Sequence, residues 1–310
     1  MTKIVECIPN FSEGRIQETI DALVNAAKTI PGVLLLDHSS DSDHNRSVFT
    51  MVGSPEGIAE AAFQLCKLAG ERIDMTKHKG EHPRMGATDV IPFVPIQNVA
   101  LDECVKISMM VAQRIWEELG IPSFLYEDSA SIPERRNLAA VRKGQFEGMP
   151  SKLLEEGWAP DYGERMIHPT AGITAIGARP PLIAYNVNLN TPDLSIAQAI
   201  ANKVRGSNGG YRSCKAMGVM LEDRNIAQVS MNLVNYEETP IYRVQEAIRF
   251  EAKRWGVNII GSELVGIAPV KALIDCAEYY LQIENFDFER QILENHLLKL
   301  QKKEEGHEPD

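Results

Sequence analysis

The segment 77–84 is where charged and proton-transferring side chains are most concentrated. Within eight positions it contains six titratable residues: Lys77, His78, Lys79, Glu81, His82 and Arg84. Gly80 and Pro83 break any helix, so these side chains do not line one solvated helical face. A histidine in such a loop can accept and return a proton near neutral pH, and its cationic neighbours can bind carboxylates. The segment therefore favours an acid–base site, with a solvated charged loop as the alternative.

A metal site is the competing interpretation of His78 and His82. Their i, i+4 spacing suits zinc when both lie on one helix, and Gly80 argues against a helix there. The sequence offers no third ligand nearby with metal-like spacing. We therefore expect no metal ion in this protein.

A second polar segment, residues 37–46, follows an apolar run and is expected to form a loop. Asp41 and Asp43 resemble part of a calcium loop, but the glycine and the terminal glutamate of such a loop are missing. A carboxylate of this segment is a candidate to orient or charge the imidazole, and Arg46 is a candidate to hold an anionic substrate. Local turns stabilised by aspartate and asparagine side chains are the alternative.

Composition limits the class of protein. The chain has 310 residues, 44% of them hydrophobic, and a net charge of -11, which is typical of a globular protein and disfavours nucleic acid or an anionic membrane as partner. Five separated cysteines predict reduced, mostly buried thiols, and neither a secretory signal nor a membrane-spanning apolar run is present, so we expect a cytoplasmic protein. The glycine patterns that bind nucleotide phosphates and the serine nucleophile elbow are also absent.

Apolar periodicity predicts the element order β-α-β-β-α-β twice. The elements expected in the first half span residues 4–8, 16–27, 33–36, 47–52, 55–69, 90–96, 102–119 and 123–126. Those expected in the second half span residues 175–179, 182–189, 193–204, 215–221, 227–233, 237–254, 257–261 and 270–281. This order is that of the split βαβ, ferredoxin-like unit. The predicted fold class is α+β, with two ferredoxin-like subdomains over residues 1–178 and 179–288 and a C-terminal helix and charged tail over residues 289–310.

The stretch 130–172 is expected to differ from both repeats. Glycine and proline punctuate it, which predicts a partly helical connector with long loops. Long loops inside a compact protein are often functional or disordered. The residues alone therefore predict a small-molecule enzyme with a histidine base in a basic loop, and leave the role of this connector open.

Six sequence stretches resemble the glutamate formiminotransferase family. They are VECIPNFSEG, DMTKHKGEHPRMGATDVIPFVPI, WAPDYG, GARPPLIAYNVNL, QVSMNLVNYEETPI and GSELVGIAP. The resemblance extends from residue 3 to about residue 285, and HKGEHPRMGA is its most specific motif. It implies a folate-dependent one-carbon transferase of histidine degradation. Such an enzyme transfers the formimino group of N-formimino-L-glutamate to tetrahydrofolate, giving 5-formiminotetrahydrofolate and L-glutamate.

The resemblance also implies roles for individual residues. The family's catalytic histidine corresponds to His82, which would act as general base and then general acid. The residues expected to bind or orient substrate are Asp37, Arg46, Lys79, Glu81 and Arg84. The family's folate-binding segment corresponds to Gly163, Glu164, Arg165, Met166, Ile167, His168, Pro169, Thr170, Ala171 and Gly172. Vertebrate members carry aromatic residues at positions 167 and 171 and an acid at position 39, so folate binding and imidazole orientation are expected to differ here.

The family further implies a substrate groove between the two subdomains and a homodimer. Because the sequence ends at Asp310, a cyclodeaminase, fused in vertebrate members, is expected to be a separate protein. Tetrahydrofolate, possibly polyglutamylated, would be a co-substrate. Two alternatives stay open: formyl transfer between glutamate and folate, because formyl and formimino groups are nearly isosteric, and a folate-binding protein without catalysis.

Overall fold

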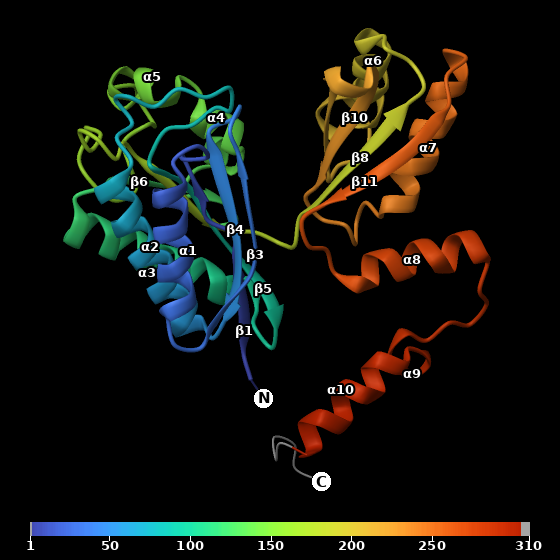
Figure 1. The fold of residues 1–310 in the computed structure, drawn as a ribbon, viewed down its shortest axis with the longest axis horizontal. Helices are drawn as coiled ribbons and strands as arrows, with labels where there is room; N and C mark the ends of the chain where they lie inside the picture. The colour runs from blue at the N-terminus through green and yellow to red at the C-terminus, as the bar shows by residue number, and fades with distance from the viewer. Residues whose placement is uncertain (1, 305–310) are drawn as a thin grey trace. The chain divides into compact units, whose positions relative to one another are not determined.

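The computed structural model describes residues 2–304, with side chains to residue 298, and divides the chain into two compact units. The first unit spans Thr2–Arg179, and the second begins at Pro180 (Figure 1). The predicted charged end of the tail, residues 305–310, lies outside the described residues. No helix in the described part of the chain has both the length and the apolar character needed to cross a bilayer.

The first unit is built on a β-α-β-β-α-β core, as predicted. Its elements are β1 (Ile4–Cys7) with its continuation β2 (Asn10–Phe11), α1 (Gln17–Thr29), β3 (Val33–Asp41), β4 (Arg46–Gly53), α2 (Pro55–Arg72) and β5 (Thr88–Gln97). β4 pairs antiparallel with β3 and with β1 and β2, which in turn pair with β5. The Ser54 hydroxyl accepts a hydrogen bond from the Gly57 amide and Pro55 starts the helix, so the predicted cap of α2 is confirmed.

Two further strands widen this sheet. After α3 (Leu101–Leu119), which ends at the left-handed Gly120, come β6 (Ser123–Glu127) and β7 (Thr174–Ala178). β7 pairs parallel with both β5 and β6. The sequence prediction that the strand near residues 175–179 opens the second repeat is therefore wrong. All five residues of β7 are buried, which suits a central parallel strand covered on both faces.

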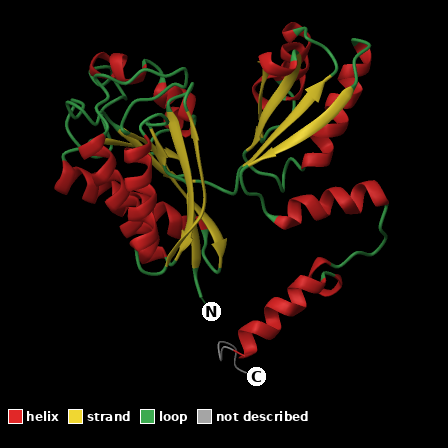
Figure 2. Cartoon of the chain, in the orientation of Figure 1, coloured by secondary structure: helices red, strands yellow, loops and turns green. Residues whose placement is uncertain are grey.

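Helices cover both faces of the first sheet (Figures 1 and 2). α1, α2 and α3 bury one face in the larger apolar core, which includes Leu23, Leu65 and Ile115. The connector contributes the short helices η1 (Pro133–Arg136), α4 (Leu138–Arg142) and α5 (Gln145–Lys152), and α4 and α5 bury Val141 and Met149 against Phe124. The predicted partly helical connector is thus confirmed, and it packs on the sheet.

The second unit repeats the β-α-β-β-α-β order. Its elements are β8 (Ile183–Leu189), α6 (Leu194–Val204), η2 (Gly206–Asn208), β9 (Cys214–Leu221), η3 (Glu222–Arg224), β10 (Ile226–Leu233), α7 (Ile241–Arg254) and β11 (Ile259–Val265). Its antiparallel strands lie in the order β11-β8-β10-β9, which is the order expected for a split βαβ unit. The chain continues as α8 (Val270–Leu281), α9 (Phe288–Gln291) and α10 (Leu293–Glu304). The predicted α+β class with two sheet-containing subdomains is confirmed.

Two element boundaries differ from the sequence prediction. Residues 37–41 continue β3 instead of forming a loop, with Asp37 opposite Thr50 and Asp41 opposite Arg46. Because β3 is an edge strand, its polar side chains stay in contact with solvent, so the strand shows no apolar alternation. α7 begins at Ile241 and not near residue 237, because Pro240 precedes it in an extended conformation.

Candidate active site

The tight turn between β3 and β4 and the segment 77–84 are joined through Asn45. Its side chain accepts a hydrogen bond from the Gly14 amide and donates one to the Lys79 carbonyl, at 2.9 and 3.1 Å. Asn45 has a φ of 49°, a left-handed conformation that asparagine tolerates better than most residues. A Cβ at Gly80 would lie 2.3 Å from the His44 carbonyl oxygen, so this close approach requires glycine. The predicted histidine loop is thereby fixed against the start of β4.

His82 is partly buried and contacts Arg46 and its own backbone. Its Nδ1 lies 2.7 Å from the Pro83 carbonyl oxygen and 3.0 Å from Arg46 Nη1. Burial, together with the positive charges of Arg46 and Arg142, lowers the pKa of His82 to about 4, whereas Asp89 and the hydrogen bond to Pro83 oppose the shift. The imidazole is therefore neutral at pH 7 and can accept a proton.

Asp89 is the buried centre of this cluster. Its Oδ2 accepts hydrogen bonds from Arg46 Nη1 at 2.9 Å and Arg142 Nη2 at 2.5 Å, while Oδ1 accepts one from the Met85 amide at 3.0 Å. The Asp89 side chain has no exposed surface. Burial opposes its ionisation, but Arg142 and Arg46 hold the pKa of Asp89 below its usual value. Asp89 is therefore an ionised carboxylate that fixes two arginines beside His82.

Arg46 is held from a second side by Asn10. Its Nε and Nη2 both donate to Asn10 Oδ1, at 3.1 and 2.6 Å. Since Asn10 belongs to β2 and Arg46 begins β4, the sheet register sets the position of the guanidinium. This arrangement gives the side chain one orientation next to the imidazole.

A pocket opens in front of His82 and Arg46. Its other lining residues are Ser39, Ser40, Asp41, His44 and Val48. Asp41 Oδ2 lies 3.1 Å from His44 Nδ1, and the ring centroids of His44 and His82 are 6.0 Å apart. The pocket thus places two imidazoles, a guanidinium, a carboxylate and two hydroxyl groups around one space, a set that suits a polar, anionic substrate.

Four of the five predicted substrate-binding residues, all except Arg46, lie outside this pocket lining. Asp37 is exposed on β3, and the lining begins two residues later, at Ser39. Lys79 and Glu81 are exposed on the histidine loop. The backbone of this loop is held in place by hydrogen bonds from Glu81 N to the Asp43 carbonyl and from Asn45 to the Lys79 carbonyl. The Lys79 and Glu81 side chains face solvent, where the Lys79 ammonium can attract an anion.

Arg84 is buried and fully engaged within the protein. Its Nε donates to His78 Nδ1, its Nη1 to Gln145 and Glu147, and its Nη2 to Glu147 and the His78 carbonyl. These contacts use all five N–H donors of a guanidinium. Arg84 therefore fastens the histidine loop to α5 and has no donor left for a substrate carboxylate.

The segment 163–172 is joined to the chain just after the histidine loop. Gly86 forms a β-bridge with Gly172, and the Ala87 amide donates to the Ala171 carbonyl at 2.8 Å. A Cβ at Gly172 would lie 2.3 Å from the Met85 carbonyl oxygen, which explains the glycine. Ala171 is 1% exposed, so no side chain at this position contacts a ligand without rearrangement.

Within the segment 163–172, some side chains are held by contacts with the protein and others face solvent. His168 Nδ1 accepts a hydrogen bond from the Ala171 amide at 2.9 Å, and Ile167 packs against the connector core. Glu164, Arg165 and Met166 are exposed, and Arg165 Nη1 lies within 3.4 Å of the Leu153 carbonyl. His168 therefore shapes the turn, whereas residues 164–166 face solvent.

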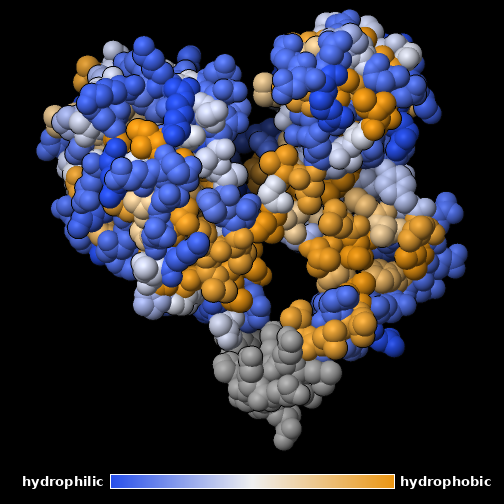
Figure 3. All heavy atoms as spheres, in the orientation of Figure 1, coloured by the Kyte–Doolittle hydropathy of each residue, from blue (hydrophilic) through white to orange (hydrophobic). Residues whose placement is uncertain are grey.

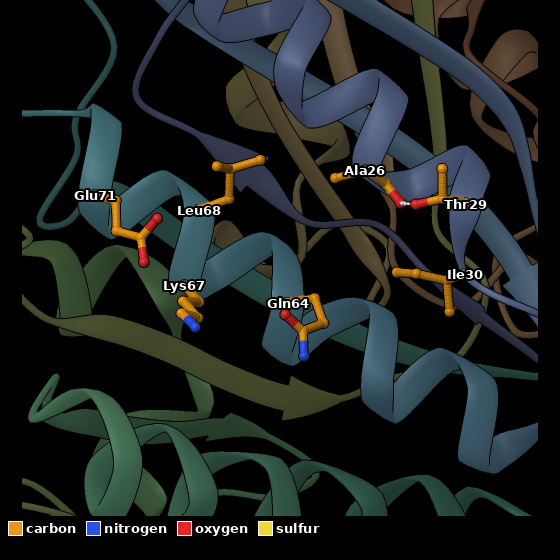
Figure 4. Close-up of a pocket in the computed structure, with 7 residues that line it drawn as sticks. All are labelled: Ala26, Thr29, Ile30, Gln64, Lys67, Leu68 and Glu71. Atoms are coloured by element: carbon orange, nitrogen blue, oxygen red, sulfur yellow. Dashed lines mark hydrogen bonds between the residues drawn. The ribbon is translucent and has the colours of Figure 1, made fainter.

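A second pocket, between α1 and α2, contains none of the predicted site residues. It is lined by Ala26, Thr29, Ile30, Gln64, Lys67, Leu68 and Glu71 (Figure 4). Its one internal hydrogen bond runs from the Thr29 hydroxyl to the Ala26 carbonyl, at 2.9 Å. Across the described residues, no cluster of three or more histidine, cysteine or acidic side chains could hold a metal ion.

Sequence reasoning missed four residues of the His82 cluster: Asn10, His44, Asp89 and Arg142. Asn10 and Asp89 lie inside two of the stretches that carry the family resemblance, VECIPNFSEG and DMTKHKGEHPRMGATDVIPFVPI, but nothing local distinguishes them from their neighbours. Arg142 lies far from Arg46 and Asp89 in the chain, and no local pattern marks it. His44 carried a signal, since it lies in the polar segment singled out beside Arg46. The protein is thus an α+β protein in which a neutral histidine lies beside two arginines on one buried carboxylate, an arrangement capable of acid–base chemistry.

Comparison with known proteins assigns the family. Residues 4–179 match the family model of the formiminotransferase domain, N-terminal subdomain, and residues 184–306 match that of the formiminotransferase domain. The glutamate formimidoyltransferase of Streptococcus pyogenes serotype M1 is 70% identical over 96% of this chain and 100% of its own length. The protein of the same name from Thermoplasma acidophilum is 47% identical over 96% and 98% of the two chains. The chain belongs to the formiminotransferase family.

A third relative is longer than this chain. The formimidoyltransferase-cyclodeaminase of Gallus gallus is 44% identical over 97% of this chain, which covers 56% of that protein. The similarity to the bifunctional protein is therefore confined to about half of its length.

Proposed function

We propose that this protein is a glutamate formimidoyltransferase, which transfers the formimino group from N-formimino-L-glutamate to tetrahydrofolate. The observation that carries the proposal is the 70% identity, over nearly the whole of both chains, to a relative of that name. The site agrees with this chemistry, because His82 is a neutral imidazole beside cationic groups, and both substrates carry carboxylates. The enzyme would act in histidine degradation.

His82 would carry out the proton transfers. Nδ1 faces both the Pro83 carbonyl, which can only accept, and Arg46 Nη1, which can only donate. In the tautomer proposed here, Nδ1 carries the proton and donates it in the shorter contact, 2.7 Å to Pro83, so the Arg46 contact is not a hydrogen bond and Nε2 carries the lone pair. As N5 of tetrahydrofolate bonds to the amidine carbon, Nε2 takes the N5 proton. The same proton then passes to the glutamate nitrogen as its bond to that carbon breaks, which releases L-glutamate. No covalent enzyme intermediate is needed, and holding two substrates together supplies much of the rate.

Substrate binding would also adjust the base. A carboxylate placed near Arg46 offsets the positive charge that lowers the pKa of His82. The imidazole would therefore become a stronger base when the anionic substrate is bound. Through this coupling, His82 would accept a proton more readily when the substrate occupies the site.

Tetrahydrofolate would be bound as co-substrate by the segment 163–172. The end of this segment is hydrogen-bonded to residues 86–87, which follow His82 in the chain by only a few positions. Ala171 and Ile167 replace the aromatic residues of vertebrate members, and Ala171 is buried, so the ring contacts would come from elsewhere. The exposed residues 164–166 are the proposed contacts of this segment.

A second copy of the chain is the proposed protein partner. Exposed apolar side chains gather over the end of β11 and over α8 (Figure 3): Val265, Ile267, Val270, Leu273 and Leu281. Apolar surface of this kind is commonly covered in a homodimer. We further propose a cytoplasmic location and cooperation with a cyclodeaminase activity.

The proposed function is tested by a coupled assay with N-formimino-L-glutamate and tetrahydrofolate, comparing the wild type with His82→Ala. We expect turnover by the wild type and a loss of about 100-fold or more in the variant, with tetrahydrofolate still bound. If the wild type is inactive with this donor but active with N-formyl-L-glutamate, the protein is a formyltransferase. Binding of tetrahydrofolate without turnover of either donor would mean a folate-binding protein.

A further inference from the structure

Three groups in the His82 cluster carry charge that is not balanced within the cluster. Arg46 and Arg142 both bond to Oδ2 of Asp89, so two positive charges share one negative charge. The side chains of Arg46 and Arg142 are only 13% and 14% exposed, and that of Asp89 is fully buried. Positive charge held in a partly buried place is stabilised by an anion, and water alone stabilises it less.

Arg142 has most of its hydrogen-bonding capacity unused. Within the described residues it forms one hydrogen bond, from Nη2 to Asp89, although a guanidinium carries five N–H donors. Its Nε is buried without a partner. By contrast, the five donors of Arg84 are all engaged, so Arg142 is the better placed of the two to bind a substrate anion.

The structure also holds Arg142 rigidly. It is the last residue of α4, whose Val141 is fully buried in the connector core. Asn137 caps the start of α4 through the Ala139 amide, and Lys152 Nζ donates to the carbonyls of Ala140 and Val141 at its end. A guanidinium fixed in this way loses little entropy when it binds a ligand.

We propose that the Arg142 guanidinium, fixed beside Arg46 by Asp89, binds a carboxylate of a substrate of this enzyme. The proposal deepens the proposed function and rests on it, since both substrates are carboxylates. It gives the connector 130–172 a role in recognition, because α4 carries the residue. The carboxylate belongs either to the formimino donor or to the glutamate of tetrahydrofolate.

The test compares Arg142→Gln with Lys143→Gln, a change of the next residue, which is exposed. We expect Arg142→Gln to raise the KM for one substrate roughly 10- to 100-fold, because a charge-assisted hydrogen bond is lost, while Lys143→Gln leaves both KM values within about twofold. Arg142→Lys should recover part of the loss, since the lysine ammonium keeps the positive charge but cannot donate two parallel hydrogen bonds to a carboxylate. The substrate whose KM rises is the one that supplies the carboxylate.

A binding measurement separates this proposal from the proposed function. L-glutamate and tetrahydrofolate are titrated calorimetrically into the wild type and Arg142→Gln, with urea unfolding to show that both are folded. Weaker binding of one of them by the folded variant supports the proposal, even if the wild type proves inactive with formiminoglutamate. Unchanged KM and Kd for both ligands in a folded Arg142→Gln would overturn it.

Discussion

The first unit contains two buried arginine–aspartate clusters that differ in how completely their hydrogen bonds are satisfied. In one, Arg135 pairs with Asp161 at 2.6 Å and also donates to Ser131 and to the carbonyls of Gly157 and Ala159. Asp161 in turn accepts from the Leu125 amide and the Ser131 hydroxyl, so the two charges are matched and, within the described part of the chain, Nε is the one guanidinium nitrogen of Arg135 without a partner. In the other, Arg46 and Arg142 share Asp89, and Arg142 retains unused donors. The matched cluster serves to hold the connector, whereas the unmatched one is suited to bind an anion.

The largest expected effect comes from breaking the matched cluster. Arg135→Met leaves Asp161, whose side chain is 9% exposed, without its cation, and we expect a loss of about 3–5 kcal/mol in the free energy of unfolding. Urea denaturation measures it. Arg136→Met is the control, because that neighbour is 65% exposed, pairs with Asp128 at 3.3 Å and should cost at most about 1 kcal/mol. Equal losses in the two variants would contradict the assignment of a structural role to the Arg135 cluster.

Next in size is the effect of Arg46→Gln on the pH profile. Arg46 is one of the charges that lower the pKa of His82 to about 4, so its removal should raise that pKa towards the usual value of 6.5. A base with a higher pKa becomes protonated earlier on acidification. The acid limb of kcat/KM should therefore move upward in pH, from near 4 in the wild type.

The measurement is kcat/KM between about pH 3 and 8 for the wild type, Arg46→Gln and Lys77→Gln. Lys77 is an exposed cation of the same loop that pairs with Asp74, so its removal should leave the limb in place. A limb that stays near pH 4 in Arg46→Gln would show that Arg46 does not control the charge of His82.

A smaller effect is expected from Gly80→Ala, which perturbs the contact that positions His82. The new methyl group would lie 2.3 Å from the His44 carbonyl oxygen, so the loop must shift, at a cost of about 1–3 kcal/mol in stability. We expect kcat/KM to fall by about tenfold. Gly148→Ala is the control, because a Cβ there meets no atom within 4 Å. Unchanged kcat/KM and stability in Gly80→Ala would mean that the close approach is not required.

The smallest effect is expected from Lys79→Ala. This exposed side chain can attract anionic substrates but is held by no neighbour in the cluster, so we expect a two- to threefold rise in KM. The rise should disappear in about 0.5 M salt, where exposed charges are screened. Assays at low and high salt measure it, and a salt-independent rise above tenfold would instead indicate direct contact with substrate.

Most of the fold could be predicted from local signals. Periodicity with a clear start and stop placed α2 after Ser54 and ended α3 at Gly120, because capping is encoded within a few residues. The strand β7 was assigned to the wrong half, since a short buried run does not specify its partner strands. The polar end of β3 was missed for the opposite reason, because an edge strand needs no apolar alternation.

The sequence by itself determined that residues 77–84 form a histidine-bearing loop, since glycine and proline at fixed positions exclude a helix. It also indicated Arg46, through its place in a charged segment at the start of a strand. Only the tertiary structure decided which charges are paired. Arg46 and Arg142 meet Asp89 across 43 and 53 residues, and Arg84 meets Glu147 across 63 residues. Pairing over such separations depends on sheet register and on helix packing, and these decide which arginine has a donor left for a substrate.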